Sequence, residues 1–181
     1  MRSLSIPCLA LAALPGAVLA QTITQDEALA LAFPGAALER RTAFLDEASL
    51  EEASRLAGPD VEVESSVVTY YVARQGGTPL GVAYFDAHRV RTLPQVLMIV
   101  VGVDGRVSRV ETVSFREPSE YRAPNGWLHQ FDGQALDAAL SLRGDIAPIT
   151  GATLTSGAAT RATRRALALH RVIDPLSEAT R

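Results

Sequence analysis

Residues 95–115 read QVLMIVVGVDGRVSRVETVSF, and this stretch decides the fold. Its first part is a run of apolar side chains, and its second part mixes valine with polar side chains. Between them stands Asp104-Gly105, a dipeptide typical of the two-residue turn of a β-hairpin. The stretch therefore predicts two antiparallel strands, over residues 95–103 and 106–115.

The residues before this hairpin predict more strands. Val, Thr and Tyr alternate with polar residues there, which is typical of strands with one face in water. A turn is expected at Gln75-Gly76-Gly77. We expect strands over residues 38–45, 61–74 and 80–86.

Two short helices are expected among these strands. Thr24 and Glu27 have the spacing of a capping box, and Pro34-Gly35 would end the helix that they begin. A second helix is expected to begin at residues 49–52 and to end at Gly58-Pro59.

More helices are expected after the hairpin. Residues 127–131 predict one helical turn, and residues 136–142 predict a short helix. A last helix is expected to begin near Thr155 or Ser156, with one apolar face formed by Ala159, Ala162, Ala166, Leu169 and Ile173. Hairpin-linked strands followed by helices predict an α+β fold, with helices packed on an antiparallel sheet.

Composition excludes several classes of function. The chain has 181 residues, enough for one domain, and a formal net charge of −3, so no basic footprint for nucleic acid is expected. All 17 basic residues are arginine, which excludes a Schiff-base lysine and a P-loop. The single cysteine, Cys8, excludes a cysteine-based zinc or iron–sulfur cluster and an internal disulfide. His129 and His170 have no partner at metal-ligand spacing, so no metal site is predicted.

The first 20 residues are typical of a secretory signal peptide. Arg2 precedes an apolar run over residues 9–14, and Val18-Leu19-Ala20 places small or apolar side chains before Gln21. The run is too short to span a bilayer, and no lipobox precedes Cys8. We therefore expect cleavage after Ala20 and a soluble mature chain that is periplasmic or otherwise exported.

The segment Ile149–Ser156, ITGATLTS, carries the chemistry. Hydroxyl side chains and a glycine stand where the last helix is expected to begin, and the free N–H groups of a helix start bind phosphate well. Thr153 is expected just ahead of the first turn. The spacing alone permits two interpretations, which are a site for a phosphate-bearing ligand and an ordinary capped helix.

Thr150-Gly151-Ala152-Thr153 resembles the [ST]-G-A-T flavinylation motif of the FMN-binding domain family, found in the RnfG and NqrC electron-transfer subunits. The similarity extends through Leu154-Thr155-Ser156 and to two earlier segments, Arg116-Glu117-Pro118 and 127–133. It covers residues 80–173. The resemblance implies that FMN is joined through its phosphate to the Thr153 hydroxyl by an exported FAD-dependent flavin transferase. It also implies cofactor contacts from Thr150, Gly151, Ala152, Leu154, Thr155 and Ser156.

One position departs from the family pattern. An aspartate usually stands three residues before the first hydroxyl residue, and that position here is Ala147, with Asp145 two residues earlier. The resemblance therefore leaves three states open: covalent FMN, FMN held without a bond, and a domain without flavin.

Several residues outside the motif are candidates for cofactor contacts. Arg89 and Arg91 are candidates for the FMN phosphate or the reduced ring, and His88 for a hydrogen bond to the isoalloxazine. Glu117 is a candidate acceptor from flavin or ribityl, and Trp127 for a wall of the flavin site. The alternatives are a solvated loop for the first three, a capping or surface role for Glu117, and a core anchor for Trp127.

These observations favour an electron carrier in which flavin does the chemistry, since no nucleophile–base pair and no catalytic residue is recognised. An FMN-dependent reductase and a flavin-free assembly partner are the alternatives. Expected partners are the flavin transferase and a membrane electron-transfer complex or another redox partner, without nucleic acid. We expect a signal peptide over 1–20, an N-terminal part of the same unit over 21–79, the FMN-binding core over 80–173 and a tail over 174–181.

Overall fold

The computed structural model describes residues 22–177. The predicted signal peptide, with Cys8 and the cleavage site after Ala20, lies outside the described residues, as does the end of the predicted tail.

Five antiparallel strands form the sheet, and strands that follow one another in the chain are neighbours in it. The order is β1-β2-β3-β4-β5. Their bounds are Ala37–Phe44 for β1, Val67–Gln75 for β2, Thr78–Arg89 for β3, Pro94–Gly102 for β4 and Val107–Phe115 for β5. The predicted α+β class with an antiparallel sheet is confirmed.

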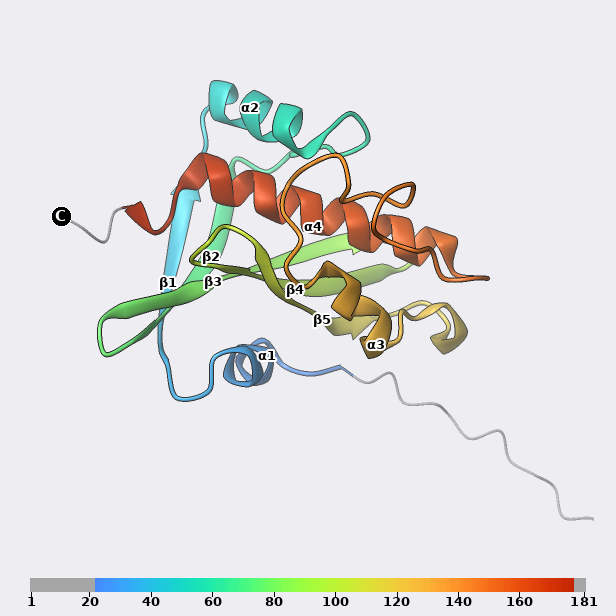
Figure 1. Ribbon diagram of the computed structural model, residues 1–181, viewed down its shortest axis with the longest axis horizontal. Helices are drawn as coiled ribbons and strands as arrows, with labels where there is room; N and C mark the ends of the chain where they lie inside the picture. The colour runs from blue at the N-terminus through green and yellow to red at the C-terminus, as the bar shows by residue number, and fades with distance from the viewer. Residues whose placement is uncertain (1–21, 178–181) are drawn as a thin grey trace, which may run out of the picture.

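Helices cover both faces of this sheet (Figure 1). α1 (Gln25–Ala32) lies on one face, and α2 (Glu47–Ala57) and α4 (Thr153–Ile173) lie on the other. The connection from β5 to α4 contains two 3₁₀ turns, Ser119–Tyr121 and His129–Phe131, and the short helix α3 (Asn125–Leu128). Among residues 22–177, no helix combines the length and the apolar character needed to cross a membrane.

The main core lies between the sheet and the long helix α4. Ala159, Ala162 and Ala166 are at most 2% exposed, so the predicted apolar face of the last helix is confirmed. Their small side chains let the helix approach the sheet closely. A second cluster, around Leu29 and Met98, packs α1 on the opposite face.

The two N-terminal helices follow their capping residues. Thr24 and Glu27 form the predicted capping box, with both reciprocal hydrogen bonds present. The second helix begins at Glu47, earlier than residues 49–52, because the Asp46 carboxylate accepts a hydrogen bond from the Ser49 N–H at 2.8 Å and caps it. It ends at Gly58, as predicted, where φ is +104°.

The prediction of one strand over residues 61–74 is wrong in its first half. β2 begins only at Val67, and residues 61–66 have no regular structure. Their backbone bonds to helices instead: the Val63 N–H donates to Ser54 Oγ at 3.4 Å, and Arg165 donates to the Glu62 carbonyl at 2.8 Å.

The predicted helix over residues 136–142 is also wrong, although Leu136 and Leu140 are buried. A helix would need these carbonyls for its own N–H groups. Instead, Arg164 Nη1 binds the carbonyls of Asp137 and Leu140 (2.6 and 3.0 Å), and the Asp145 N–H binds that of Ala139 (2.8 Å). Tertiary hydrogen bonds therefore hold this segment as a series of turns.

Two further boundaries differ from the predictions. The hairpin between β4 and β5 is present, but its loop covers residues 103–106, with Gly105 at φ +74°. β3 extends to Arg89, so His88 and Arg89 lie inside a strand and not in a loop after it.

Candidate functional site

The predicted motif lies at the start of α4. Gly151, at φ +81°, turns the chain, Ala152 occupies the N-cap position, and Thr153 is the first residue of the helix. The expected start at Thr155 or Ser156 is therefore wrong, and Thr153 does not lie ahead of the first turn. Thr150, Gly151, Thr153 and Leu154 are exposed, whereas Ala152, Thr155 and Ser156 are buried.

Thr155 and Ser156 lie inside the helix and do not cap it, and their hydroxyls form other hydrogen bonds. Thr155 Oγ1 donates to the Tyr121 carbonyl at 2.6 Å. Ser156 Oγ accepts from the Ile149 N–H at 2.9 Å and donates to the Ala152 carbonyl at 3.2 Å. The two buried hydroxyls hold the motif loop against the protein and leave the Thr153 hydroxyl exposed.

The N-terminus of α4 has no side-chain cap. Among the described residues, no acceptor faces the N–H groups of Thr153, Leu154 and Thr155. The helix runs for 21 residues, and its dipole places partial positive charge at this end. The start of α4 is therefore suited to an anionic group.

A cavity of about 220 Å³ opens beside this helix start. Its lining residues come from three segments and are Arg91, Tyr121 and residues 151–155. The Arg91 guanidinium lies over the Tyr121 ring, 5.2 Å from its centroid. The cavity thus joins an arginine to the uncapped helix end.

Glu117 positions the segment that carries Arg91. Its Oε1 accepts hydrogen bonds from the backbone N–H groups of Leu93, Thr92 and Arg91, at 2.8, 2.7 and 3.1 Å. These N–H groups hold the pKa of Glu117 below its usual range. Glu117 thus caps the backbone N–H groups of residues 91–93, which was one of its predicted alternatives. Its contact with flavin stays a prediction.

Trp127 contacts the segment before the motif and does not line the cavity. Its Nε1 donates to the Ala147 carbonyl at 2.7 Å, and its ring meets Phe131 edge-on at 5.4 Å. Gln130 Oε1 accepts from the Ala147 N–H at 2.9 Å. The backbone of Ala147 is therefore fixed from both sides, and its side chain is exposed.

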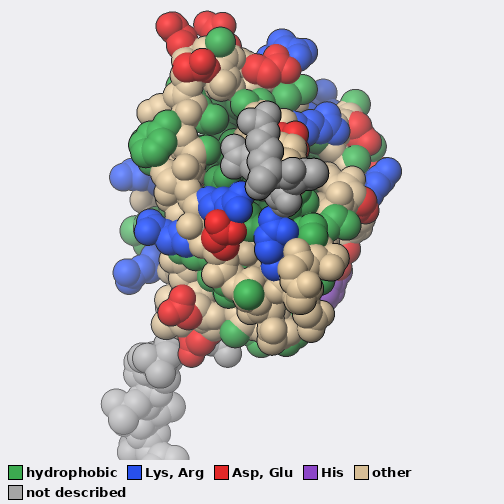
Figure 2. Space-filling view, turned by 90° about the vertical axis from the view of Figure 1, so that its left-hand side faces the viewer, with side chains coloured by type: hydrophobic (Ala, Val, Ile, Leu, Met, Phe, Trp, Pro, Cys, Tyr) green, Lys and Arg blue, Asp and Glu red, His purple; other side chains and the backbone are tan. Residues whose placement is uncertain are grey.

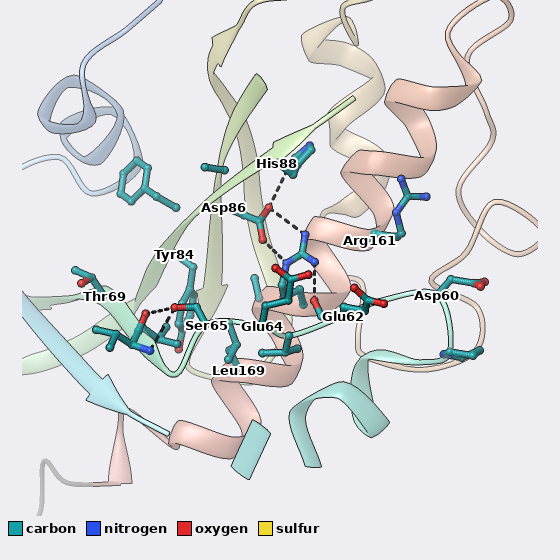
Figure 3. Close-up of a pocket in the computed structure, with 18 residues that line it drawn as sticks. Asp60, Glu62, Glu64, Ser65, Thr69, Tyr84, Asp86, His88, Arg161 and Leu169 are labelled. Atoms are coloured by element: carbon teal, nitrogen blue, oxygen red, sulfur yellow. Dashed lines mark hydrogen bonds and ion pairs between the residues drawn. The ribbon is translucent and has the colours of Figure 1, made fainter. Parts of the chain in front are cut away.

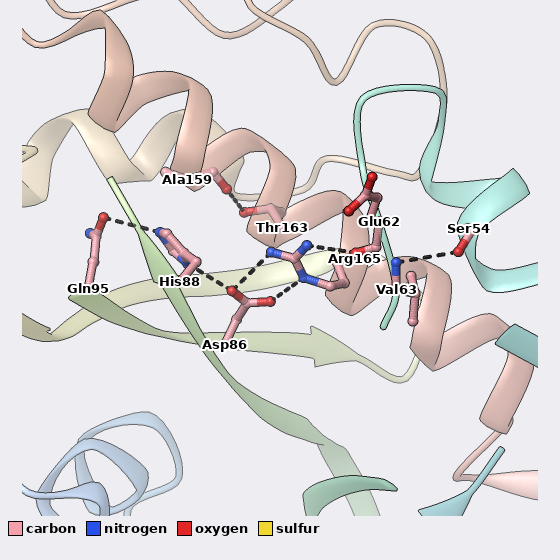
Figure 4. A network of polar contacts seen from close by, with 9 residues as sticks. All are labelled: Ser54, Glu62, Val63, Asp86, His88, Gln95, Ala159, Thr163 and Arg165. Atoms are coloured by element: carbon pink, nitrogen blue, oxygen red, sulfur yellow. Dashed lines mark hydrogen bonds and ion pairs between the residues drawn. The ribbon is translucent and has the colours of Figure 1, made fainter. Parts of the chain in front are cut away.

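His88 lies in a different place, with both ring nitrogens engaged (Figure 4). Its Nδ1 lies 2.8 Å from Asp86 Oδ1, and its Nε2 lies 3.3 Å from Gln95 Oε1. Asp86 also pairs with Arg165, whose Nε is 2.7 Å from Oδ2. Burial alone would raise the pKa of Asp86, but the hydrogen bonds from His88 and Arg165 outweigh it and lower the pKa.

This network forms one wall of a wide cavity of about 950 Å³ between α4, β3 and residues 59–65 (Figure 3). Glu62 and Glu64 lie on one side of it and Arg161 on another. The wide cavity contains no residue of the Thr150–Ser156 motif. The structure therefore places His88 in a different cavity from the motif, and its hydrogen bond to the isoalloxazine stays a prediction.

Of the two predicted arginines, the structure places only Arg91 beside the motif. Arg89 is the last residue of β3 and does not line the small cavity. Strand alternation puts its side chain on the sheet face opposite His88.

Arg161 is a cation near the motif that the sequence analysis did not single out. A Cβ on Gly157 would lie 3.2 Å from Arg161 Nη1, so the guanidinium rests over the bare backbone of Gly157. This places it within about one helical turn of Thr153. The spacing of four between Thr153, Gly157 and Arg161 was a signal that could have identified it.

No group of three or more His, Cys, Asp or Glu residues within 22–177 has the arrangement of a metal site. Residues 94–168 match the family model of the FMN-binding domain. The matched range begins at β4 and ends inside α4, and it includes Glu117, Trp127 and the Thr150–Thr153 motif. A search of curated proteins finds no match.

Proposed function

Residues 94–168 form a domain of the FMN-binding family, and from this premise we propose that the chain is an exported electron-transfer flavoprotein with FMN joined through its phosphate to the Thr153 hydroxyl. The observation that carries the proposal is the exposed threonine at the first position of an uncapped 21-residue helix. The family match supports FMN as the cofactor. Attachment, export and electron transfer are our proposal.

The residues at the helix start fit the phosphate end of FMN. Sites that enclose a whole small molecule usually measure about 300–1,000 Å³. The cavity beside Thr153, about 220 Å³, is smaller and suits one end of the cofactor. Nothing lies within 4 Å of the position that a Cβ on Gly151 would occupy, so the loop is open to an approaching group.

Each residue of this site has a defined part in the proposal. In the reaction catalysed by the flavin transferase, the Thr153 hydroxyl oxygen bonds to the phosphorus of the FMN half of FAD. The bond between the two phosphates breaks, AMP leaves, and the hydroxyl proton is released. The free N–H groups of α4 and the Arg91 guanidinium stabilise the phosphate charge. Thr155 and Ser156 hold the loop, and Glu117 holds the segment of Arg91. When bound, the flavin supplies the capacity to accept and release electrons.

A comparison of threonine variants tests the attachment. The protein is co-expressed with an exported flavin transferase and examined for flavin fluorescence after denaturing electrophoresis. Wild type is expected to fluoresce and Thr153→Ala to be dark. Thr155→Ala, the control from the same loop, is expected to fluoresce. A fluorescent Thr153→Ala band would contradict the assignment.

Ala147 supplies a second arm of this experiment. Its side chain is exposed, and only its backbone bonds to Trp127 and Gln130, so an aspartate fits at this position. If transferase recognition limits labelling, Ala147→Asp is expected to increase the fluorescence of the band. A wild type and an Ala147→Asp variant that both stay dark would contradict covalent attachment.

A further inference from the structure

Four arginines stand in the segments at one end of the sheet, Arg91 beside the motif and Arg89 on the sheet face opposite His88, and we refer to Arg89, Arg91, Arg116 and Arg122 as the basic rim. Arg89 pairs with Pro94 across β3 and β4, and the Arg116 N–H donates to the Pro94 carbonyl at 3.1 Å. Arg91 lies over the ring of Tyr121, the residue before Arg122. These contacts place the backbone of all four residues at one end of the molecule.

The arginines of the basic rim form no ion pairs with carboxylates among the described residues. Ion pairs between arginine and carboxylate occur elsewhere, at Arg41, Arg55, Arg109 and Arg165. Two acidic residues stand in the segments that carry these arginines. Glu117 is buried and accepts hydrogen bonds from backbone N–H groups, and Glu120 is exposed.

Figure 2 shows the end of the molecule opposite the motif, where arginines are spread over the middle of the view and acidic side chains gather at its top, at the position of α2. α2 and its N-cap contribute four acidic residues: Asp46, Glu47, Glu51 and Glu52. The whole chain has a formal net charge of −3, so the positive charge of the basic rim is opposite in sign to the net charge of the chain.

Two exposed leucines stand beside the basic rim. Leu93 is 42% exposed and follows Arg91 by two residues, and Leu154 is 55% exposed and follows Thr153. Exposed apolar side chains surrounded by charge are typical of a surface where proteins meet briefly, with the charges guiding the encounter.

We propose that the basic rim, with Leu93 and Leu154, is the docking surface for an acidic redox protein that exchanges electrons with the flavin on Thr153. This inference rests on the proposed function, because it needs the flavin at that position. Opposite charge raises the rate of encounter and orients the partner with its redox centre toward the cofactor.

Small oxidants of opposite charge probe this surface. The flavinylated protein is reduced and mixed with anionic ferricyanide or cationic hexaammineruthenium. The reduced flavin anion gives one electron to each of two oxidant ions and releases one proton. We expect the ferricyanide rate constant to fall as ionic strength rises from about 10 mM to about 1 M, where the Debye length shrinks from about 30 Å to about 3 Å.

Charge reversal then locates the effect. The variant Arg116→Glu is expected to slow the oxidation of the reduced flavin by ferricyanide about three- to tenfold at low salt and to speed its oxidation by hexaammineruthenium. The double variant with Arg89→Glu is expected to show both effects more strongly. The control, Arg171→Glu, changes an exposed arginine roughly 27 Å along α4 from Thr153 and is expected to change neither rate. Rates are compared at equal flavin content, and melting curves check the fold.

Several outcomes would overturn the proposal. Equal effects of Arg116→Glu and Arg171→Glu would mean that the rim does not steer the oxidant. Co-sedimentation with vesicles of phosphatidylglycerol and phosphatidylcholine in equal parts, lost in Arg116→Glu, would assign the rim to a membrane surface instead. A preparation that takes up no flavin would contradict the proposed function as well, whereas charge-independent rates in a flavinylated protein would contradict only this inference.

Discussion

At the scale of single residues, His170 shows how burial sets a pH response. The Tyr84 hydroxyl lies 3.1 Å from His170 Nδ1, inside the core between β3 and α4. Burial lowers the pKa of His170 to about 4 and raises that of Tyr84. At neutral pH the ring is therefore uncharged, and it shares a hydrogen bond with the tyrosine hydroxyl.

This pair predicts a loss of stability in mild acid. In the unfolded chain His170 has its ordinary pKa of 6.5, so below that pH the unfolded state binds a proton that the folded state does not. The stabilisation is fully present above pH 6.5 and declines as the pH falls toward 4. It amounts to at most about 3 kcal/mol. Urea unfolding of wild type and His170→Gln at pH 7, 6 and 5 checks this, and the variant is expected to show the shallower pH dependence. Equal slopes would assign the effect to other groups.

The site could be predicted residue by residue only where a local pattern carried the information. The capping box identified Thr24 and Glu27, and the tetrapeptide at 150–153 predicts Thr153 as the attachment residue, which stays a prediction. The role of Glu117 depends on partners in another segment, and the position of Arg161 depends on its close approach to Gly157. Such contacts leave little trace in local composition, because an exposed arginine or a glutamate before a proline is ordinary.

At the scale of elements, the alternation of apolar residues predicted the sheet and the apolar face of α4 well. The two segments whose secondary structure was wrongly predicted differ from the predictions for the same reason. Residues 61–66 and 136–142 have suitable local patterns, but α4 supplies tertiary partners for their carbonyls through Arg165 and Arg164. Local propensity is a weak prior where distant side chains satisfy the backbone.

The Asp86–Arg165 pair joins three elements, β3, α4 and the segment 61–66, because Arg165 also holds the Glu62 carbonyl. Asp86→Asn is expected to lower the free energy of unfolding by about 2 kcal/mol at pH 7. Breaking a fully buried ion pair costs roughly 3–5 kcal/mol, and we expect a smaller loss here because the Arg165 side chain is 24% exposed. The segment 61–66 is expected to exchange amide hydrogens faster.

The pH dependence identifies the carboxylate as the cause. The folded pKa of Asp86 lies below its ordinary value of 3.8, so its stabilisation is present above that pH and is lost as the pH falls through the folded pKa. The difference between wild type and Asp86→Asn should therefore narrow below about pH 4. Glu52→Gln, which removes the exposed pair with Arg55 on α2, is the matched control and should change little. A constant difference at all pH values would point to packing instead.

At the scale of the whole molecule, the proposed flavin attachment depends on the predicted export. The proposed transferase is itself exported, so only a chain that has left the cytoplasm can meet it. The N-terminal pattern around Arg2, residues 9–14 and Ala20 predicts that the labelled protein begins at Gln21.

A charge placed in the apolar run tests this dependence. Leu11→Arg interrupts the run at residues 9–14 and is expected to leave an uncleaved, unlabelled chain in the cytoplasm, since a signal peptide needs an uninterrupted apolar region. Ser3→Arg adds the same charge next to Arg2, where a signal peptide is normally basic, and is expected to be exported, cleaved and labelled. N-terminal sequencing of the fluorescent protein from the periplasm gives the decisive reading. A fluorescent chain that retains Met1, or a Leu11→Arg variant labelled as fully as wild type, would show that attachment does not require this route.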